Sequence, residues 1–190
     1  MEDLTDMPEI DVAELSAELE RLRETVRRLS DRQEIFDCLH RYNRGLDRLD
    51  TDSVMSAYFP DADDHHGSFR GTPAQFTDWV MGHMLEWDSS LHILDLNNLT
   101  IDGDSADSEC YVLFTQRRAD HDHLDFGGAR YLDHLERRDG EWRIAQRTLV
   151  VDWTARADLT TLPDTAAHPP VKRDRTDPSY SRPFRVRAAG

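Results

Sequence analysis

The chain has 190 residues, which suits one domain with some additional length at its ends. Hydrophobic residues make up 38% and charged residues 32%, so a buried core can form but the surface or the tails must be very polar. The formal net charge of −15 argues against a nucleic-acid partner, because phosphate binding requires clustered Lys and Arg.

The cysteines and the N-terminus indicate a cytoplasmic location. Cys38 and Cys110 lie far apart and outside any CxxC spacing, so we expect free thiols that pack as small apolar residues. The first ten residues, MEDLTDMPEI, are acidic and lack the apolar core of a signal peptide. No apolar run approaches the roughly 20 residues that a bilayer-spanning helix needs. We therefore expect no membrane association.

The N-terminal part of the chain is predicted to be helical after a flexible segment at residues 1–10. Over residues 11–30, apolar residues recur at spacings of three and four, which predicts an amphipathic helix with a heptad-like phase: Leu15, Leu19, Leu22, Val26 and Leu29. We expect this helix to pack on its own domain or at a subunit interface. Ser30 to Gln33 has the pattern of a capping box, which predicts that a second helix opens there.

The second helix would bury Ile35, Leu39, Tyr42 and Leu46, and a short third helix is predicted from about Asp52 to Tyr58. The string PDADDHHGSFRG then predicts a short hairpin. Thr72-Pro73-Ala74-Gln75 combines an N-cap residue, a first-turn proline and a glutamine at the third position, which predicts a helix start. The buried face of that helix is predicted to carry Phe76, Trp79, Val80 and Met84.

From residue 90 the apolar residues alternate with period two. LHILDLNNLTI and SECYVLFTQRRA predict one antiparallel pair, and ARYLDHLERR and EWRIAQRTLVVDW predict a hairpin around Asp139-Gly140. Helices followed by such strands predict an α+β domain, which we place at residues 31–155. We expect a cone-shaped, strongly bent antiparallel sheet wrapped around the N-terminal helices, an α+β barrel with a hollow mouth. Residues 156–190 form a tail, predicted to be an arm or a cover.

Four strings resemble the SnoaL-like branch of the nuclear-transport-factor-2-like superfamily: RQEIFDCLHRYNRGLD, FPDADDHHGSFRG, SSLHILDLNNLTIDG and GGARYLDHLERRDGEWRIAQR. The spacing Tyr42…Asp47…His92 is also similar to that of three cofactor-free lyases of this fold, scytalone dehydratase, hexachlorocyclohexane dehydrochlorinase and bile acid 7α-dehydratase. In those enzymes an Asp near the end of the long helix pairs with a His at the start of a long strand. The resemblance implies that Asp47 and His92 form such a pair here.

An Asp–His pair suits proton abstraction without metal or cofactor. A neighbouring carboxylate raises the basicity of a histidine and fixes its tautomer, so His92 would be the base and Asp47 its orienting partner. Tyr42 is either a substrate-polarising hydroxyl or a core tyrosine, and the similarity to bile acid 7α-dehydratase favours the first. The similarity to the dehydrochlorinase implies that Arg147 stabilises a departing anion or an enolate.

The other candidate substrate-binding residues are His66, Trp79 and Arg130. Arg130 and Tyr131 are consecutive in a strand, so only one of them faces the interior, and the pattern does not decide which. The ligand-rich string from Asp61 to His66 is interpreted as a solvated loop with no metal, because its side chains are consecutive rather than spaced on regular elements.

These features predict a cofactor-independent lyase of the dehydratase type that acts on a hydrophobic cyclic substrate such as a steroid, terpenoid or polyketide. An isomerase or cyclase that uses the same pair, or a non-catalytic small-molecule-binding or assembly subunit, is the alternative. We expect self-association as a trimer or dimer, through the heptad-like helix and the tail.

Overall fold

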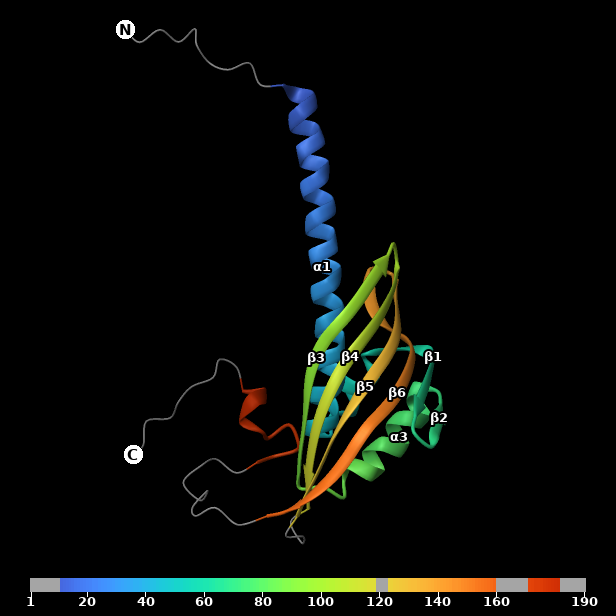
Figure 1. Ribbon diagram of the computed structural model, residues 1–190, viewed down its shortest axis with the longest axis vertical. Helices are drawn as coiled ribbons and strands as arrows, with labels where there is room; N and C mark the ends of the chain where they lie inside the picture. The colour runs from blue at the N-terminus through green and yellow to red at the C-terminus, as the bar shows by residue number, and fades with distance from the viewer. Residues whose placement is uncertain (1–10, 119–122, 160–170, 182–190) are drawn as a thin grey trace, which may run out of the picture.

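The computed structural model describes residues 11–118, 123–159 and 171–181, and its elements confirm an α+β chain order (Figure 1). Residues 1–10 and most of the predicted tail lie outside this part. The elements are α1 (Val12–Arg48), α2 (Thr51–Met55), β1 (Tyr58–His66), β2 (Phe69–Gly71), α3 (Pro73–Met84), β3 (Ser89–Asp102), β4 (Ser105–Arg117), β5 (His123–Arg138), β6 (Glu141–Asp158) and η1 (Pro178–Tyr180). None of the helices in the described part is long and apolar enough to cross a membrane.

One continuous helix, α1, replaces the two helices predicted for residues 11–48, so the predicted capping box at Ser30 is wrong. The helix starts at the N-cap Asp11, whose carboxylate accepts hydrogen bonds from Ala13 N and Glu14 N at 2.8 and 3.3 Å. The Ser30 hydroxyl instead donates to the Glu34 carboxylate at 3.1 Å, one turn along the same helix. Ser30 therefore takes part in a side-chain pair between positions i and i+4 on the helix surface and does not cap a helix.

The sheet has six strands in the order β2-β1-β6-β5-β4-β3. All neighbouring pairs are antiparallel except β1 and β6, which run parallel, so the sheet is mixed and the fully antiparallel sheet that we predicted is corrected. The helix α2 ends at Met55 rather than near Tyr58, and β1 begins at Tyr58, where it pairs with Ile144 of β6. Pro60 lies inside β1 at an irregularity in its register with β6, a position where a missing N–H donor is tolerated.

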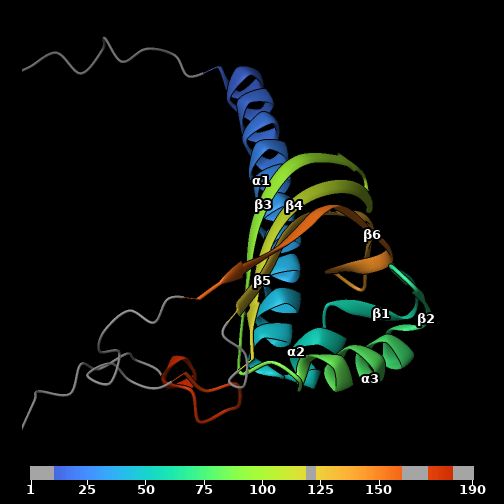
Figure 2. The same cartoon turned by 60° about the horizontal axis from the view of Figure 1, so that its bottom comes forward.

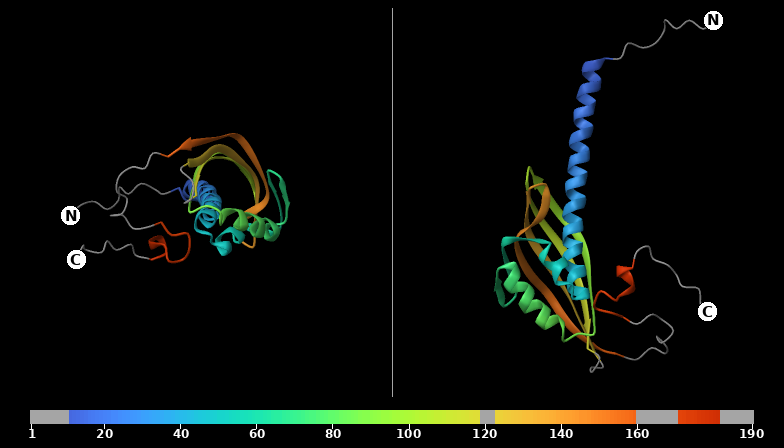
Figure 3. Two further views of the ribbon diagram at one scale, coloured as in Figure 1. Left: turned by 90° about the horizontal axis from the view of Figure 1, so that it is seen from below. Right: turned by 180° about the vertical axis from the view of Figure 1, so that it is seen from behind.

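The degree of bending was also predicted wrongly. The sheet is curved, but its edge strands β2 and β3 do not pair with each other, so it stays open rather than forming the strongly bent barrel that we expected. The curved sheet lies around the C-terminal half of α1, with α3 on the opposite side (Figures 2 and 3). The helix α3 contacts β1, β2 and α1 there.

The helix start at Thr72 and the turn at Asp139-Gly140 were predicted correctly. Thr72 caps α3 in a reciprocal capping box with Gln75. Asp139 and Gly140 both have positive φ, 53° and 83°, as the two-residue turn between β5 and β6 requires. These signals depend on contacts between residues close in sequence, which is why sequence alone identifies them.

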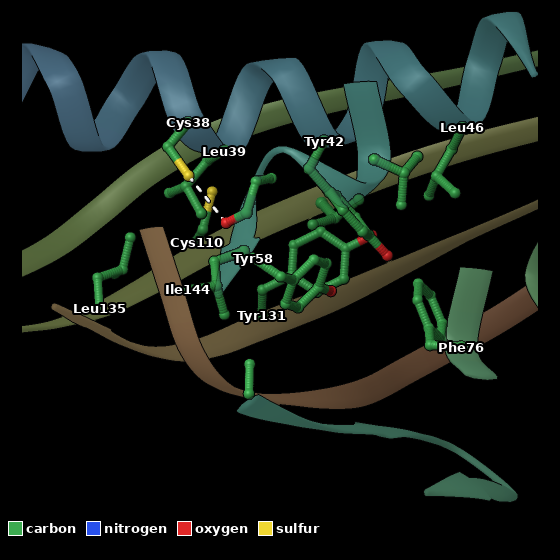
Figure 4. Close-up of a cluster of buried hydrophobic side chains, with 14 of the residues drawn as sticks. Cys38, Leu39, Tyr42, Leu46, Tyr58, Phe76, Cys110, Tyr131, Leu135 and Ile144 are labelled. Atoms are coloured by element: carbon green, nitrogen blue, oxygen red, sulfur yellow. Dashed lines mark hydrogen bonds between the residues drawn. The ribbon is translucent and has the colours of Figure 1, made fainter. Parts of the chain in front are cut away.

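Four aromatic rings, of Tyr42, Tyr58, Phe76 and Tyr131, pack between α1 and the strands with centroids 5.7 to 6.3 Å apart (Figure 4). All four side chains are at most 2% exposed. At the level of Tyr42 the interior is therefore filled by aromatic side chains.

Both cysteines are buried and free, and we expect neither to react in the folded protein. Burial raises the pKa of Cys38 to about 11 and that of Cys110 to about 12, so the reactive thiolate is scarce near neutral pH. Cys38 also donates a hydrogen bond to the Ala57 carbonyl at 3.3 Å (Figure 4). Titration with a thiol reagent at pH 8 should label no thiol in the native protein and both in denaturant.

Candidate active site

Asp47 and His92 lie in direct contact. His92 Nδ1 is 2.7 Å from Asp47 Oδ1, and the two side chains are 9% and 12% exposed. The same carboxylate accepts a hydrogen bond from the His92 backbone N–H at 3.0 Å and one from the Ser90 hydroxyl at 3.1 Å. Three donors from the start of β3 thus hold one carboxylate at the end of α1.

This contact fixes the chemistry that His92 can perform. An ionised carboxylate only accepts hydrogen bonds, so Nδ1 of a neutral His92 must carry the proton. Nε2 then keeps its lone pair and can accept a proton from another molecule. The arrangement is that of an oriented general base, with Asp47 as the orienting group.

The end of α1 places Asp47 at the sheet. The helix ends at Leu49, which has a left-handed φ of 51°, and the Asp50 N–H then bonds to the Gly45 carbonyl at 2.8 Å. Gly45 is required for this tight turn, because a Cβ there would lie 2.7 Å from Val54 Cγ2. On the sheet side, His92 is opposite Phe114 of β4, which in turn is opposite Gly127 of β5.

An arginine from the C-terminal tail, Arg173, secures the main chain behind Asp47. Its guanidinium donates to the carbonyls of Asp47 and Leu46 at 3.0 Å each, and to those of Met84 and Trp87 at 2.6 Å each. Arg173 thereby satisfies four carbonyl groups at the C-terminal ends of α1 and α3. Burial lowers the pKa of Arg173, whereas the negative charge of Asp47 opposes that shift.

We expect Arg173→Ala to destabilise the protein by about 1–3 kcal/mol, because buried carbonyls would lose their donor. Its neighbour Arg175 offers a matched control, since that side chain is 66% exposed where it pairs with Asp50 and Asp52. Arg175→Ala should change the free energy of unfolding by less than about 1 kcal/mol. Urea unfolding of both variants measures the difference, and equal stabilities would contradict the structural role assigned to Arg173.

A second polar group lies deeper in the interior, around Arg147. This side chain is fully buried and makes two hydrogen bonds of 2.7 Å to the carboxylate of Asp133. The guanidinium carbon lies 4.2 Å from the ring centroid of Tyr42 and 4.0 Å from that of Tyr131. Burial raises the pKa of Tyr42 well above its ordinary value, so its hydroxyl keeps its proton and remains a donor.

On the other side of Arg147, β1 contributes Asp64 and His66. Tyr58 Oη donates to Asp64 Oδ2 at 2.5 Å, and His66 Nδ1 is 3.3 Å from Asp64 Oδ1. In the described part of the chain, four buried atoms of this inner group lack a hydrogen bond of ordinary geometry: Tyr42 Oη, Asp64 Oδ1, His66 Nδ1 and Arg147 Nη1. Donors and acceptors of this kind can bind an oxygen function of a small molecule.

Two candidate substrate-binding residues do not lie in the interior. Arg130 is on the outer face of the sheet, where it pairs with Asp152 and Glu109, so its expected role is corrected. The register of β5 places the neighbouring Tyr131 inside instead, 2% exposed. Trp79 was predicted to be buried but is 41% exposed, with its ring 5.3 Å from that of Phe69.

Residues 61–66 lie in strand β1, which pairs antiparallel with β2, so the predicted short hairpin is confirmed and the interpretation of these residues as a solvated loop is wrong. The residues of β1 alternate, so Asp64 and His66 face inward while Asp63 pairs with the exposed Arg70. Within the described residues, no three His, Cys, Asp or Glu side chains come together as a metal site. Four residues of these two groups were not among the candidates: Ser90, Asp64, Asp133 and Arg173. Ser90 and Arg173 contact Asp47 or its carbonyl group from more than 40 residues away in the sequence, and Asp64 and Asp133 reach the interior through the pairing of the strands.

Comparison with known proteins identifies a family for most of the chain. The model of the SnoaL-like domain matches residues 27–148. Comparison with curated proteins gives no sequence match. A solved hexachlorocyclohexane dehydrochlorinase, LinA-type3 from Novosphingobium barchaimii LL02, is 20% identical with a TM-score of 0.65, over 73% of this chain and 99% of that one.

Two further solved structures have the same fold. A candidate scytalone dehydratase from Novosphingobium aromaticivorans DSM 12444 is 19% identical with a TM-score of 0.61, over 73% of this chain and 93% of that one. A protein of unknown function from Mycobacterium tuberculosis is 20% identical with a TM-score of 0.61, over 67% and 75% of the two chains. At these identities the likeness establishes the fold and leaves the activity to the site residues.

Proposed function

Because this chain belongs to the SnoaL-like domain family and holds an oriented histidine beside a buried carboxylate, we propose that it is a cofactor-independent lyase of the dehydratase type. The observation that carries the proposal is the 2.7 Å contact between His92 Nδ1 and Asp47 Oδ1, which leaves Nε2 as the basic atom. The structural likeness to a dehydrochlorinase and a candidate dehydratase supports elimination as the reaction class.

The proposed reaction needs only groups of the protein and the substrate. His92 Nε2 takes a proton from a substrate carbon next to the one that bears the hydroxyl group. The electron pair of the broken C–H bond forms the double bond as the C–O bond breaks. The imidazolium of His92 then gives its proton to the departing hydroxide, so that water leaves and the neutral base is restored.

Tyr42 and Arg147 are proposed to polarise an oxygen function of the substrate. Tyr42 precedes Asp47 by five residues, which corresponds to a rise of about 7–8 Å along the helix. The Tyr42 hydroxyl and Arg147 Nη1 are buried and lack hydrogen bonds of ordinary geometry to the described residues, so a substrate oxygen that reached them would meet two donors. Developing negative charge on an enolate oxygen would be stabilised by such donors in a dry environment.

The proposed substrate is a hydrophobic cyclic alcohol of the steroid, terpenoid or polyketide type. Support comes from the apolar residues on the face of the sheet that carries His92, namely Leu94, Val112 and Phe114. In such a substrate, the carbon next to the hydroxyl-bearing carbon would lie at His92 Nε2, and a carbonyl oxygen of the same ring system would accept hydrogen bonds from Tyr42 and Arg147.

Product analysis tests this function. The protein would be incubated with a panel of cyclic β-hydroxy ketones in D₂O, and the products examined by mass spectrometry. Loss of one water from a substrate supports the dehydratase. A rearranged product that carries deuterium and has lost no water identifies an isomerase that uses the same base. Binding without any turnover identifies a non-catalytic binding subunit.

A further inference from the structure

The N-terminal half of α1 carries a line of apolar side chains that face solvent, here named the seam: Val12, Leu15, Leu19, Leu22, Val26 and Leu29. Their side chains are 46% to 71% exposed. Figures 1 and 3 show this half of the helix extending beyond the sheet in two opposite views. The family match begins at residue 27, so most of the seam is an addition to the matched domain.

A projecting helix of this length is marginal in water unless its apolar face is covered. Residues 31–48 are held by the domain and supply the helix nucleus. The projecting residues therefore extend an existing helix, and they need only a partner that covers their apolar face. Single apolar residues on a protein surface are common, but six large ones in one line form a contiguous patch, which is typical of an interaction surface.

The heptad pattern of the seam specifies the kind of partner. Its spacings of three and four place Val12, Leu19 and Val26 at the a positions, and Leu15, Leu22 and Leu29 at the d positions. Two of the three a residues are β-branched valines and all three d residues are leucines, and β-branched residues at a with leucine at d favour a parallel coiled coil of two strands. The same face continues at Gln33, Phe36 and His40, of which Phe36 is 36% exposed and lies against His40 with ring centroids 4.1 Å apart.

The direction of the seam leaves room for a second copy. With 100° per residue, the seam points about half a turn away from the helix face that the domain buries. That buried face carries Ile35, Cys38 and Tyr42. Two helices that meet along their seams would therefore hold the two sheets on opposite outer sides, where they do not collide.

Charged residues beside the seam agree with a parallel pairing. Glu18 is at a g position and Arg23 is at the following e position, which face each other between the two helices of a parallel coiled coil. Both side chains are more than half exposed, and they pair with Arg21 and Glu20 on the surface of their own helix. They can re-pair across an interface, and two such pairs would form in a symmetric dimer.

We infer that the chain is a dimer joined by a parallel, in-register, two-stranded coiled coil of α1 residues 12–29. The occupant of the seam is the seam of a second copy. In this dimer the sheets take no part in the interface. The candidate active sites of the two copies then lie away from the coiled coil.

Sedimentation of the full-length protein over a range of concentrations tests the inference. Wild type should be a dimer. Leu22→Asp should raise the dissociation constant of the dimer by about 100-fold or more, because a charge would be buried at a d position. Ala17→Asp is the matched control, since it adds the same charge to the same exposed helix outside the seam. A monomeric wild type, or equal dissociation constants for the two variants, would overturn the proposal.

Cross-linking tests the orientation of the two helices. In a parallel, in-register dimer the two Leu22 positions face each other, so Leu22→Cys should form an intermolecular disulfide under mild oxidation, whereas Ala17→Cys should not. The native thiols give no background, because Cys38 and Cys110 are buried. Separately, Glu18→Arg and Arg23→Glu should each weaken the dimer, and the double variant should recover it. A double variant as weak as either single one contradicts parallel pairing.

Discussion

Replacing His92 by alanine is expected to lower turnover by about 10²–10⁴-fold, the usual contribution of a general base. The fold should persist, because His92 is at the start of β3 and its side chain is only one of three donors to Asp47. Turnover would be measured with the substrate found by product analysis, and folding by thermal unfolding. An alanine variant with wild-type turnover would remove His92 from the proposed mechanism.

The outer face of the sheet offers a matched control for this variant. His134 Nδ1 is 2.8 Å from Asp107 Oδ1, almost the same contact as in the Asp47–His92 pair, but the His134 side chain is 37% exposed and remote from the interior. His134→Ala should leave turnover unchanged. Comparing the two histidines separates the effect of losing the proposed base from the general effect of losing an Asp–His contact.

Replacing Asp133 by asparagine is expected to destabilise the fold by about 3–5 kcal/mol, because it leaves Arg147 charged and buried without its partner. Both side chains are 0% exposed, and the guanidinium lies between the rings of Tyr42 and Tyr131. Burial raises the pKa of Asp133, and Arg147 opposes this shift by favouring the carboxylate. The free energy of unfolding in urea measures the loss.

The Arg130–Asp152 pair, on the opposite face of the same two strands, is the control. It also joins an arginine to an aspartate at 3.0 Å, but its side chains are 30% and 37% exposed. Asp152→Asn should change the free energy of unfolding by about 0–1 kcal/mol. If Asp133→Asn fails to fold, the double variant Asp133→Leu/Arg147→Met should recover folding, since no charge remains buried. Equal effects of Asp133→Asn and Asp152→Asn would contradict the buried pair.

The candidate pair could be identified from sequence because spacing and resemblance indicate it. Asp47 is near the end of the long helix and His92 is at the start of a long strand, and the register of β3 brings them into contact. The set that surrounds Arg147 could not be predicted in the same way. Asp64, Asp133 and Arg147 occupy three strands, and their contact depends on a parallel β1–β6 pairing that no local pattern indicates.

Errors at single positions have the same origin. From the sequence, either Arg130 or Tyr131 could face the interior. The pairing of β5 with β4 decides between them, because Tyr131 is opposite the buried Cys110 and Arg130 is opposite the exposed Tyr111. Ser30 has the sequence of a cap, but the helix continues through it because Asp31, buried beside Trp142, packs against the end of the sheet. Arg173 was missed because its four partners are carbonyl groups, which carry no sequence signal.

The amino-acid sequence by itself determined the order of helices and strands, the caps and turns at Thr72 and Asp139-Gly140, and the heptad phase of the seam. These features depend on residues a few positions apart, whose interactions are the same wherever the segment lies. Only the tertiary structure decided which charges are buried, which face of β5 is inside, and that a tail arginine holds the end of α1 beside Asp47. Those outcomes depend on strand register and on contacts between distant segments, where a shift of one residue reverses the result.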